Sequence, residues 1–187
     1  MPLIIRKAKE EDLSALIKLL PEPNSYTLEK AKALVQRMSL YSNYTLFVAV
    51  QDSTLVAGFS LLLMDNLAHE GSPSGMIDDL VLACAPASKE DVARAIMNFA
   101  LEQCNKQHCY KLCVANQHAL VHTLLTSESS TFSQHGLCFV RELGKKDKPQ
   151  KAFSLLNNGV QIREAAKADL PQILELYKQP ALLHKSN

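Results

Sequence analysis

Two adjacent carboxylates, Asp78 and Asp79, interrupt an otherwise apolar run from Met76 to Leu82. A carboxylate beside a substrate ammonium can accept its proton, directly or through water, and so free the amine for nucleophilic attack. Because successive side chains of a strand point to opposite faces, at most one of the two acids can face a cleft. The alternative is that both acids lie at the solvated start of the strand. The pair is therefore a candidate general base, with the choice between positions 78 and 79 open.

Cysteine and histidine residues gather in the stretch between Cys104 and His122. His118 and His122 have the i, i+4 spacing that is found in helical zinc sites. The cysteines, however, straddle the end of a predicted helix and the strand after it, so we expect their side chains to diverge. The sequence therefore favours buried thiols and solvated imidazoles over a metal site.

The acidic pair lies within a series of predicted strands and helices. Short β-branched and apolar runs predict strands over residues 3–8, 45–50, 55–63, 76–82, 110–114, 137–140 and 152–156. Apolar residues at helical spacing predict helices over residues 10–20, 28–38, 88–100 and 118–125. The turn-forming residues 51–53 join two strands into a hairpin, and Ser88–Asp91 is typical of a capping box. We therefore expect a mixed α/β domain.

The composition is that of an ordinary globular protein. The 187 residues are 47% hydrophobic and 21% charged, with a formal net charge of +1. This length suits one domain, and so small a net charge recruits neither nucleic acid nor an anionic membrane. The lysine-rich stretch Lys145–Lys148 is most simply a solvated hairpin tip. The longest apolar stretch, Leu55–Met64, is too short to cross a membrane, and five cysteines do not make a secreted disulfide scaffold. We expect a cytoplasmic protein with reduced thiols.

Residues 162–176 repeat the pattern of residues 5–19 at an offset of 157, with identical residues at six positions. The repeat predicts a second strand and helix in a tail, residues 158–187, after a main domain of residues 1–157. The apolar residues of this tail need a surface to cover them. We therefore expect the tail to dock on its own domain or to pair with another chain as a homodimer, in preference to disorder.

The order of the predicted elements, together with the runs Ile77–Leu82 and Ala95–Leu101, resembles the GNAT family of acetyl-CoA-dependent N-acetyltransferases over nearly the whole chain. The resemblance implies an acyl-CoA N-acyltransferase fold, with a central mixed, mostly antiparallel sheet flanked by helices. It also implies transfer of an acetyl group from acetyl-CoA to a primary amine, with Asp78 or Asp79 as the general base.

The resemblance places a loop for the CoA pyrophosphate on Ser88–Ala93. The family's pattern there is Arg or Gln, two residues, Gly, one residue, then Gly or Ala, because backbone N–H groups must approach the pyrophosphate closely. Only Ala93 matches, and Asp91 would repel the pyrophosphate. The residues that the resemblance assigns to acetyl-CoA are Val81, Leu82, Ser88, Lys89, Val92, Ala93 and Asn116. Asn116 is equally well explained as the N-cap of the next helix. We expect acetyl-CoA to bind weakly or not at all.

Phe132 stands where many family members have a tyrosine that protonates the leaving thiolate. Phenylalanine has no proton to give, and we expect the neighbouring His135 to be a surface residue. The degenerate loop, the missing tyrosine and the repeated tail leave two functions open. One is an N-acetyltransferase, and the other is a catalytically silent GNAT-like module with a role in assembly or regulation.

Overall fold

The computed structural model describes residues 2–20, 26–67, 69–85, 88–115, 119–127, 130–134 and 162–178. The chain divides into two compact units, Met1–Ser133 and Gln134–Asn187. The predicted domain boundary after residue 157 and the predicted strands over residues 137–140 and 152–156 lie outside the described residues. None of the helices in the described ranges is long and apolar enough to cross a membrane.

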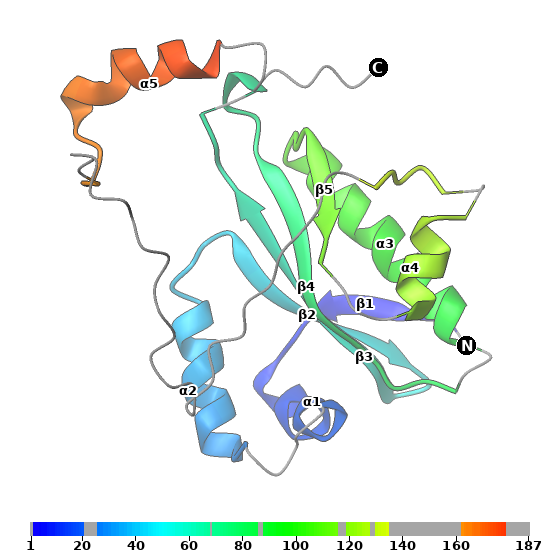
Figure 1. Cartoon of the computed structure of the whole chain (residues 1–187). Coiled ribbons are helices and arrows are strands. Elements are labelled where there is room, and N and C mark those ends of the chain that lie inside the picture. Colours follow the sequence, from blue (N-terminus) through cyan, green and yellow to red (C-terminus); the bar gives the residue numbers. More distant parts are fainter. Residues whose placement is uncertain are drawn as a thin grey trace, which may run out of the picture. The chain divides into compact units, whose positions relative to one another are not determined.

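A five-stranded sheet in the order β1-β2-β3-β4-β5 forms the centre of the first unit (Figure 1). The strands are β1 (Ile4–Lys7), β2 (Tyr44–Gln51), β3 (Thr54–Met64), β4 (Ser74–Leu82) and β5 (Lys111–Val114). The first four pair antiparallel, and β5 runs parallel to β4. The predicted hairpin over β2 and β3 is confirmed, and its turn residues Asp52 and Ser53 have φ of 51° and 62°, as a tight hairpin turn requires. The mixed, mostly antiparallel sheet is therefore confirmed.

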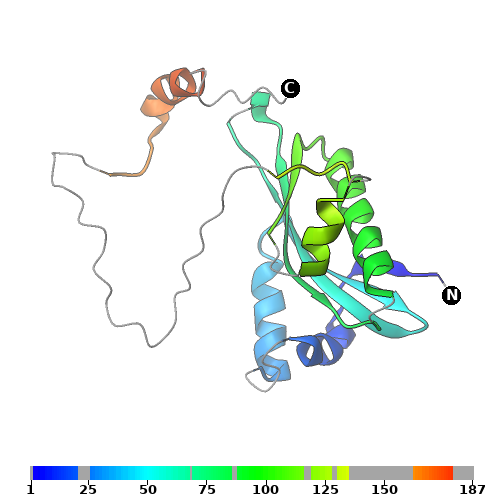
Figure 2. The same cartoon turned by 45° about the vertical axis from the view of Figure 1, so that its right-hand side comes forward.

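Helices cover both faces of this sheet (Figures 1 and 2). They are α1 (Leu13–Leu19), which follows a short 3₁₀ helix η1 (Glu10–Asp12), α2 (Leu28–Met38), α3 (Lys89–Lys106) and α4 (Ala119–Leu125). The helices α3 and α4 lie on one face, and α1 and α2 lie on the other. On the first face Phe47, Phe59 and Phe99 form an aromatic cluster, with the rings of Phe47 and Phe99 5.0 Å apart. On the second face, Leu16 of α1 packs over Gly58 of β3.

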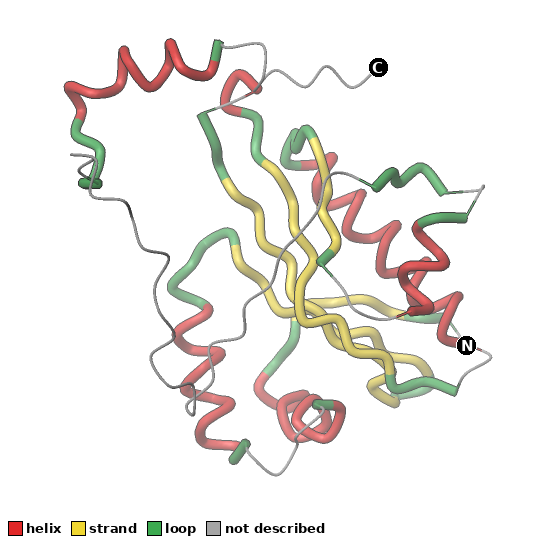
Figure 3. The backbone as a smooth tube through the Cα atoms, viewed as in Figure 1, coloured by secondary structure: helices red, strands yellow, loops and turns green. Residues whose placement is uncertain are grey.

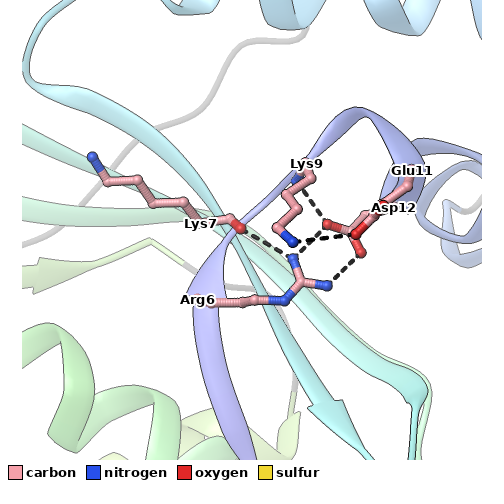
Figure 4. Close-up of polar contacts among 5 residues, drawn as sticks. All are labelled: Arg6, Lys7, Lys9, Glu11 and Asp12. Atoms are coloured by element: carbon pink, nitrogen blue, oxygen red, sulfur yellow. Dashed lines mark hydrogen bonds and ion pairs between the residues drawn. The ribbon is translucent and has the colours of Figure 1, made fainter.

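An ion pair joins β1 to the start of the first helix (Figure 4). Arg6 donates through Nη1 to Oδ2 of Asp12 at 2.7 Å and through Nη2 to Oδ1 at 2.8 Å. The backbone N–H of Lys9 donates to the same carboxylate at 2.7 Å. Asp12 is only 8% exposed, and the Arg6 guanidinium holds the pKa of its carboxyl below its ordinary value. We call this arrangement the Arg–Asp clasp.

The second unit carries a copy of this clasp. Arg163 donates through both terminal nitrogens to Asp169 at 2.7 Å, and the N–H of Ala166 donates to Asp169 at 2.7 Å. A 3₁₀ helix η5 (Lys167–Asp169) and the helix α5 (Leu170–Tyr177) follow, in the same order as in the first unit (Figure 3). The predicted tail helix is therefore confirmed. The strand predicted at its start is wrong, because residues 162–166 pair with no strand within the described ranges.

Candidate functional site

A bulge in β4 holds the two acidic residues. The pairing of β4 with β3 shifts register between Gly58 and Ser60, and Asp79 sits at this point with φ of 51°. The N–H of Asp79 donates to Oδ1 of Asp78 at 2.9 Å, and the hydroxyl of Ser60 donates to the carbonyl of Asp78 at 3.1 Å. A residue inserted in this way bends the strand and re-aims the side chains beside it. The directions of the Asp78 and Asp79 side chains are therefore set by the bulge, and not by the regular alternation of side chains along a strand.

Asp78 lines a cavity of about 260 Å³ on the sheet face that carries α1 and α2. The other lining residues are Tyr41, Tyr44, Leu62 and Met76. Tyr44, Leu62 and Met76 are direct partners across β2, β3 and β4, so their side chains share this face. Sequence reasoning missed all four. The predicted hairpin alone would set Tyr44 opposite Leu61, and the register shift between Ala49 and Val50 moves its partner to Leu62, so the sequence pattern could not have indicated this pair.

Both acidic residues are exposed, but Asp79 does not line the cavity. Partial desolvation, with the negative charge of Asp78 as a second cause, raises the pKa of its carboxyl above the ordinary value. A raised pKa disfavours the charged form that a carboxylate needs to hold a cation. Of the two predicted acids, the geometry brings only Asp78 into the cavity.

Among the residues that the structure describes, no strand pairs with the β5 side of β4 from Asp78 onward. The last pair between β4 and β5 is Ile77 with Val114, and the N–H of Ala115 donates to the carbonyl of Ile77 at 3.2 Å. Beyond this point β5 has ended, while β4 continues to Leu82. On the other edge, the N–H of Ala83 donates to Val56 at 2.8 Å. Because successive residues of a strand direct their N–H and C=O groups to opposite sides, those of residues 80 and 82 point to the side on which β5 has ended.

The start of α3 is the predicted pyrophosphate loop. The helix begins at Lys89 as expected, but the predicted capping box is wrong, because Ser88 makes no side-chain cap hydrogen bond. Its backbone is helical, with φ of −99° and ψ of −7°, whereas an N-cap that bonds the first turn has an extended backbone. Glu90 is exposed and pairs with Arg94 at 2.9 Å, and Asp91 is exposed beside it.

The remaining residues assigned to acetyl-CoA differ in what they can offer. Val81 and Leu82 lie in the open stretch of β4, and Lys89 is half-buried. Val92 and Ala93 are 3% and 0% exposed in the core, so only their backbone can face a ligand. Asn116 lies outside the described residues.

The two elements that the resemblance assigns to acetyl-CoA, the end of β4 and the start of α3, would fit it unequally. Within the described ranges, the backbone groups of residues 80 and 82 on the β5 side of β4 have no strand partner, and they could bond an extended amide-containing arm. The first turn of α3 has no side-chain cap, but it presents the carboxylates of Glu90 and Asp91, and residues 83–91 contain no glycine. Negative charge at a helix N-terminus competes with an anionic ligand for the same N–H groups. The arm therefore fits and the pyrophosphate fits poorly.

Phe132 packs partly buried against the core, and its N–H donates to the hydroxyl of Ser130 at 3.1 Å. Its ring cannot donate a proton, and His135 lies outside the described residues. Within the part of the chain that the structure describes, no three His, Cys, Asp or Glu side chains come together as metal ligands.

No protein-family model and no curated protein sequence matches this chain. Solved structures do match it. An acetyltransferase from Trypanosoma brucei shares 20% identity with a TM-score of 0.64, over 76% of this chain and 100% of its own. Glucosamine-6-phosphate N-acetyltransferase from Arabidopsis thaliana shares 17% identity with a TM-score of 0.64, over 77% and 100%. A GNAT family acetyltransferase from Staphylococcus aureus shares 13% identity with a TM-score of 0.57, over 76% and 100%. The chain therefore has the fold of the GNAT-family acetyltransferases.

Proposed function

We propose that this protein transfers an acetyl group from acetyl-CoA to a primary amine, with Asp78 as the general base. The observation that carries the proposal is the position of Asp78. It lines the apolar cavity and is also the first residue beyond the last pair between β4 and β5. A base in this position lies between a space for an amine and an open strand edge for an acyl donor.

The chain's own groups have distinct tasks in this reaction. When bound, acetyl-CoA supplies an activated thioester carbonyl. Asp78 accepts the proton of the substrate ammonium, and the bulge with the Ser60 hydrogen bond fixes the backbone that carries it. Backbone N–H groups of the open stretch of β4 can donate to a carbonyl oxygen as charge develops there. Because Phe132 has no proton for the leaving group, water must supply it, and we expect slow turnover.

Turnover with a panel of primary amines tests this proposal. We expect release of free CoA that depends on both the amine and the protein. No release above the rate without protein, for any amine, would contradict it. Calorimetric titration should give a dissociation constant for acetyl-CoA weaker than about 10 μM, which corresponds to roughly 7 kcal/mol. The double variant Lys89→Gly, Asp91→Gly should bind acetyl-CoA more tightly, because it removes the carboxylate and frees the backbone at the helix start.

A second candidate function is assembly through the tail, and the duplicated clasp favours it. Leu13, which follows the first clasp, is 3% exposed, whereas its counterpart Leu170 is 44% exposed. Ile162 is 85% exposed, and Leu174 is 43% exposed. A segment with the same clasp and the same spacing of apolar residues as residues 5–19 is suited to the same kind of surface. We propose that, in a homodimer, it covers the surface that residues 5–20 cover in a second copy of the chain.

Sedimentation of the full chain tests this assembly. We expect a dimer that Leu170→Ser with Leu174→Ser converts to monomer, while the exposed control Gln172→Ser leaves it intact. Lys32 offers a charge test, because it pairs with Glu10 at 2.6 Å and the counterpart of Glu10 in the tail is Lys167. Lys32→Glu should therefore raise the dimer fraction. A wild-type monomer that none of these changes affects would contradict the assembly role.

A further inference from the structure

Among the described residues that line it, the cavity beside Asp78 has one charged group between apolar and aromatic walls. Its five lining residues are one carboxylate, two tyrosines, one leucine and one methionine. No lysine, arginine or histidine is among them. Asp78 is exposed at the mouth of the cavity, and its carboxylate attracts a cation and repels an anion there.

The tyrosines add to this selection. Tyr41 is 66% exposed and Tyr44 is half-buried, so their rings form an accessible part of the wall. The face of a tyrosine ring attracts an ammonium group within about 6 Å of its centre. Leu62 and Met76 offer only apolar atoms to the rest of the ligand. Hydroxyl-rich or multiply charged bodies would lose their hydration against these two side chains without gaining hydrogen bonds.

The volume of the cavity indicates how large a ligand body it can cover. An apolar cavity of roughly 150 Å³ holds a benzene molecule in other proteins. A cavity of about 260 Å³ therefore has room for one aromatic ring, or a branched alkyl group of that size, with a short aminoalkyl arm. A phosphorylated amino sugar would bring a doubly charged group for which the lining has no cation.

We propose that the acceptor is a small primary amine with an apolar, aromatic or branched alkyl body and no anionic group. Its ammonium lies at Asp78, and its body lies against Tyr41, Tyr44 and the two aliphatic walls. This class rests on the proposed function for its role as acceptor, but binding to the cavity does not depend on turnover.

Binding of 2-phenylethylamine to the full chain, followed by protein NMR shifts without acetyl-CoA, tests the class. We expect Asp78→Asn to weaken binding by about tenfold or more, because it removes the charge that pairs with the ammonium. Tyr41→Ala should weaken it by about threefold through the loss of the ring face. Tyr41 is exposed, so this variant keeps the fold, and Leu40→Ala is its matched control because Leu40 is 80% exposed and does not line the cavity.

Three comparison ligands complete the test. Ethylamine lacks the body, 3-phenylpropionate carries the opposite charge and glucosamine 6-phosphate carries a phosphate. Each should bind at least about tenfold more weakly than 2-phenylethylamine. Equal or tighter binding of the phosphosugar, or a Tyr41→Ala variant that binds like Leu40→Ala, would overturn the substrate class. Specific binding of 2-phenylethylamine, with no acetylation of it or of any other amine, would keep the class as a binding site and refute the proposed function. Acetylation of glucosamine 6-phosphate, without acetylation of 2-phenylethylamine, would support the proposed function and refute the substrate class.

Discussion

Removing the first Arg–Asp clasp with Asp12→Ala should destabilise the main unit substantially. The change deletes two hydrogen bonds from Arg6 and one from the N–H of Lys9, all between 2.7 and 2.8 Å. A hydrogen bond to a charged group contributes roughly 1.5–3 kcal/mol, but the three share one carboxylate and are not additive. The side chain of Arg6 is 31% exposed, which lowers the total. We therefore expect a loss of about 2 kcal/mol in the free energy of unfolding, or roughly 5–8 °C in melting temperature.

The pH dependence of this loss identifies its cause. The clasp lowers the pKa of Asp12 from its ordinary value of 3.8, so the stabilisation is fully present above pH 3.8. It is lost as pH falls through the lowered pKa of the folded state, where the carboxylate takes up a proton. Urea denaturation at pH 7 and in steps below pH 4 should therefore show the difference between wild type and Asp12→Ala shrinking with acid.

The tail supplies a matched control for this experiment. Asp169 makes the same three hydrogen bonds, but its partner Arg163 has a side chain that is 66% exposed. Water competes for an exposed pair, so Asp169→Ala should change the main melting temperature by less than about 1 °C. Equal losses in the two variants, or a loss for Asp12→Ala that does not change with pH, would refute the reasoning.

Three further changes test other parts of the structure. Asp79→Asn should raise stability at pH 7 by up to about 0.5 kcal/mol, and the gain should vanish below pH 3.8, because ionising a carboxyl with a raised pKa costs folding energy only at higher pH. Urea denaturation would show it, and a gain that persists in acid would contradict it. Gly75→Ala should lower the free energy of unfolding by about 1–3 kcal/mol in the same assay, because the new Cβ would collide with Sγ of Cys104 and lie 3.2 Å from Leu112. Unchanged stability would contradict this packing. Iodoacetamide at pH 8 should alkylate exposed Cys113 before Cys104, since burial is the main cause that raises the pKa of the Cys104 thiol to about 12; the reverse order by mass spectrometry would refute this.

The sequence predicted the strands, the helices and their order well where periodicity is strong. Asp52 and Ser53 gave a recognisable hairpin turn, and Lys89 begins the helix that the apolar spacing indicated. The bulge at Asp79 could not be predicted, because it depends on how β4 pairs with β3 and not on local pattern. The absent cap at Ser88 was missed for a related reason, since residue type indicates a cap but backbone geometry decides it.

Half of the candidate site could be predicted. The acidic pair stood out because charge in an apolar strand is rare. The cavity did not, because Tyr41 and Tyr44 lie more than thirty residues before Asp78 and meet it only across three strands. The tail repeat was predicted from identities alone, and the clasp gives those identities a physical reason, since Arg163 and Asp169 are two of them.

The most direct test of the account is the specificity constant for acetylation of 2-phenylethylamine by wild type, Asp78→Asn and Asp79→Asn. The two substitutions are chemically identical and adjacent, but only Asp78 lines the cavity. We predict that Asp78→Asn lowers kcat/KM by roughly a hundredfold, within the range of a lost general base, and that Asp79→Asn stays within about threefold of wild type. Full activity in Asp78→Asn, an equal loss in both variants, or no acetylation by wild type would contradict the account.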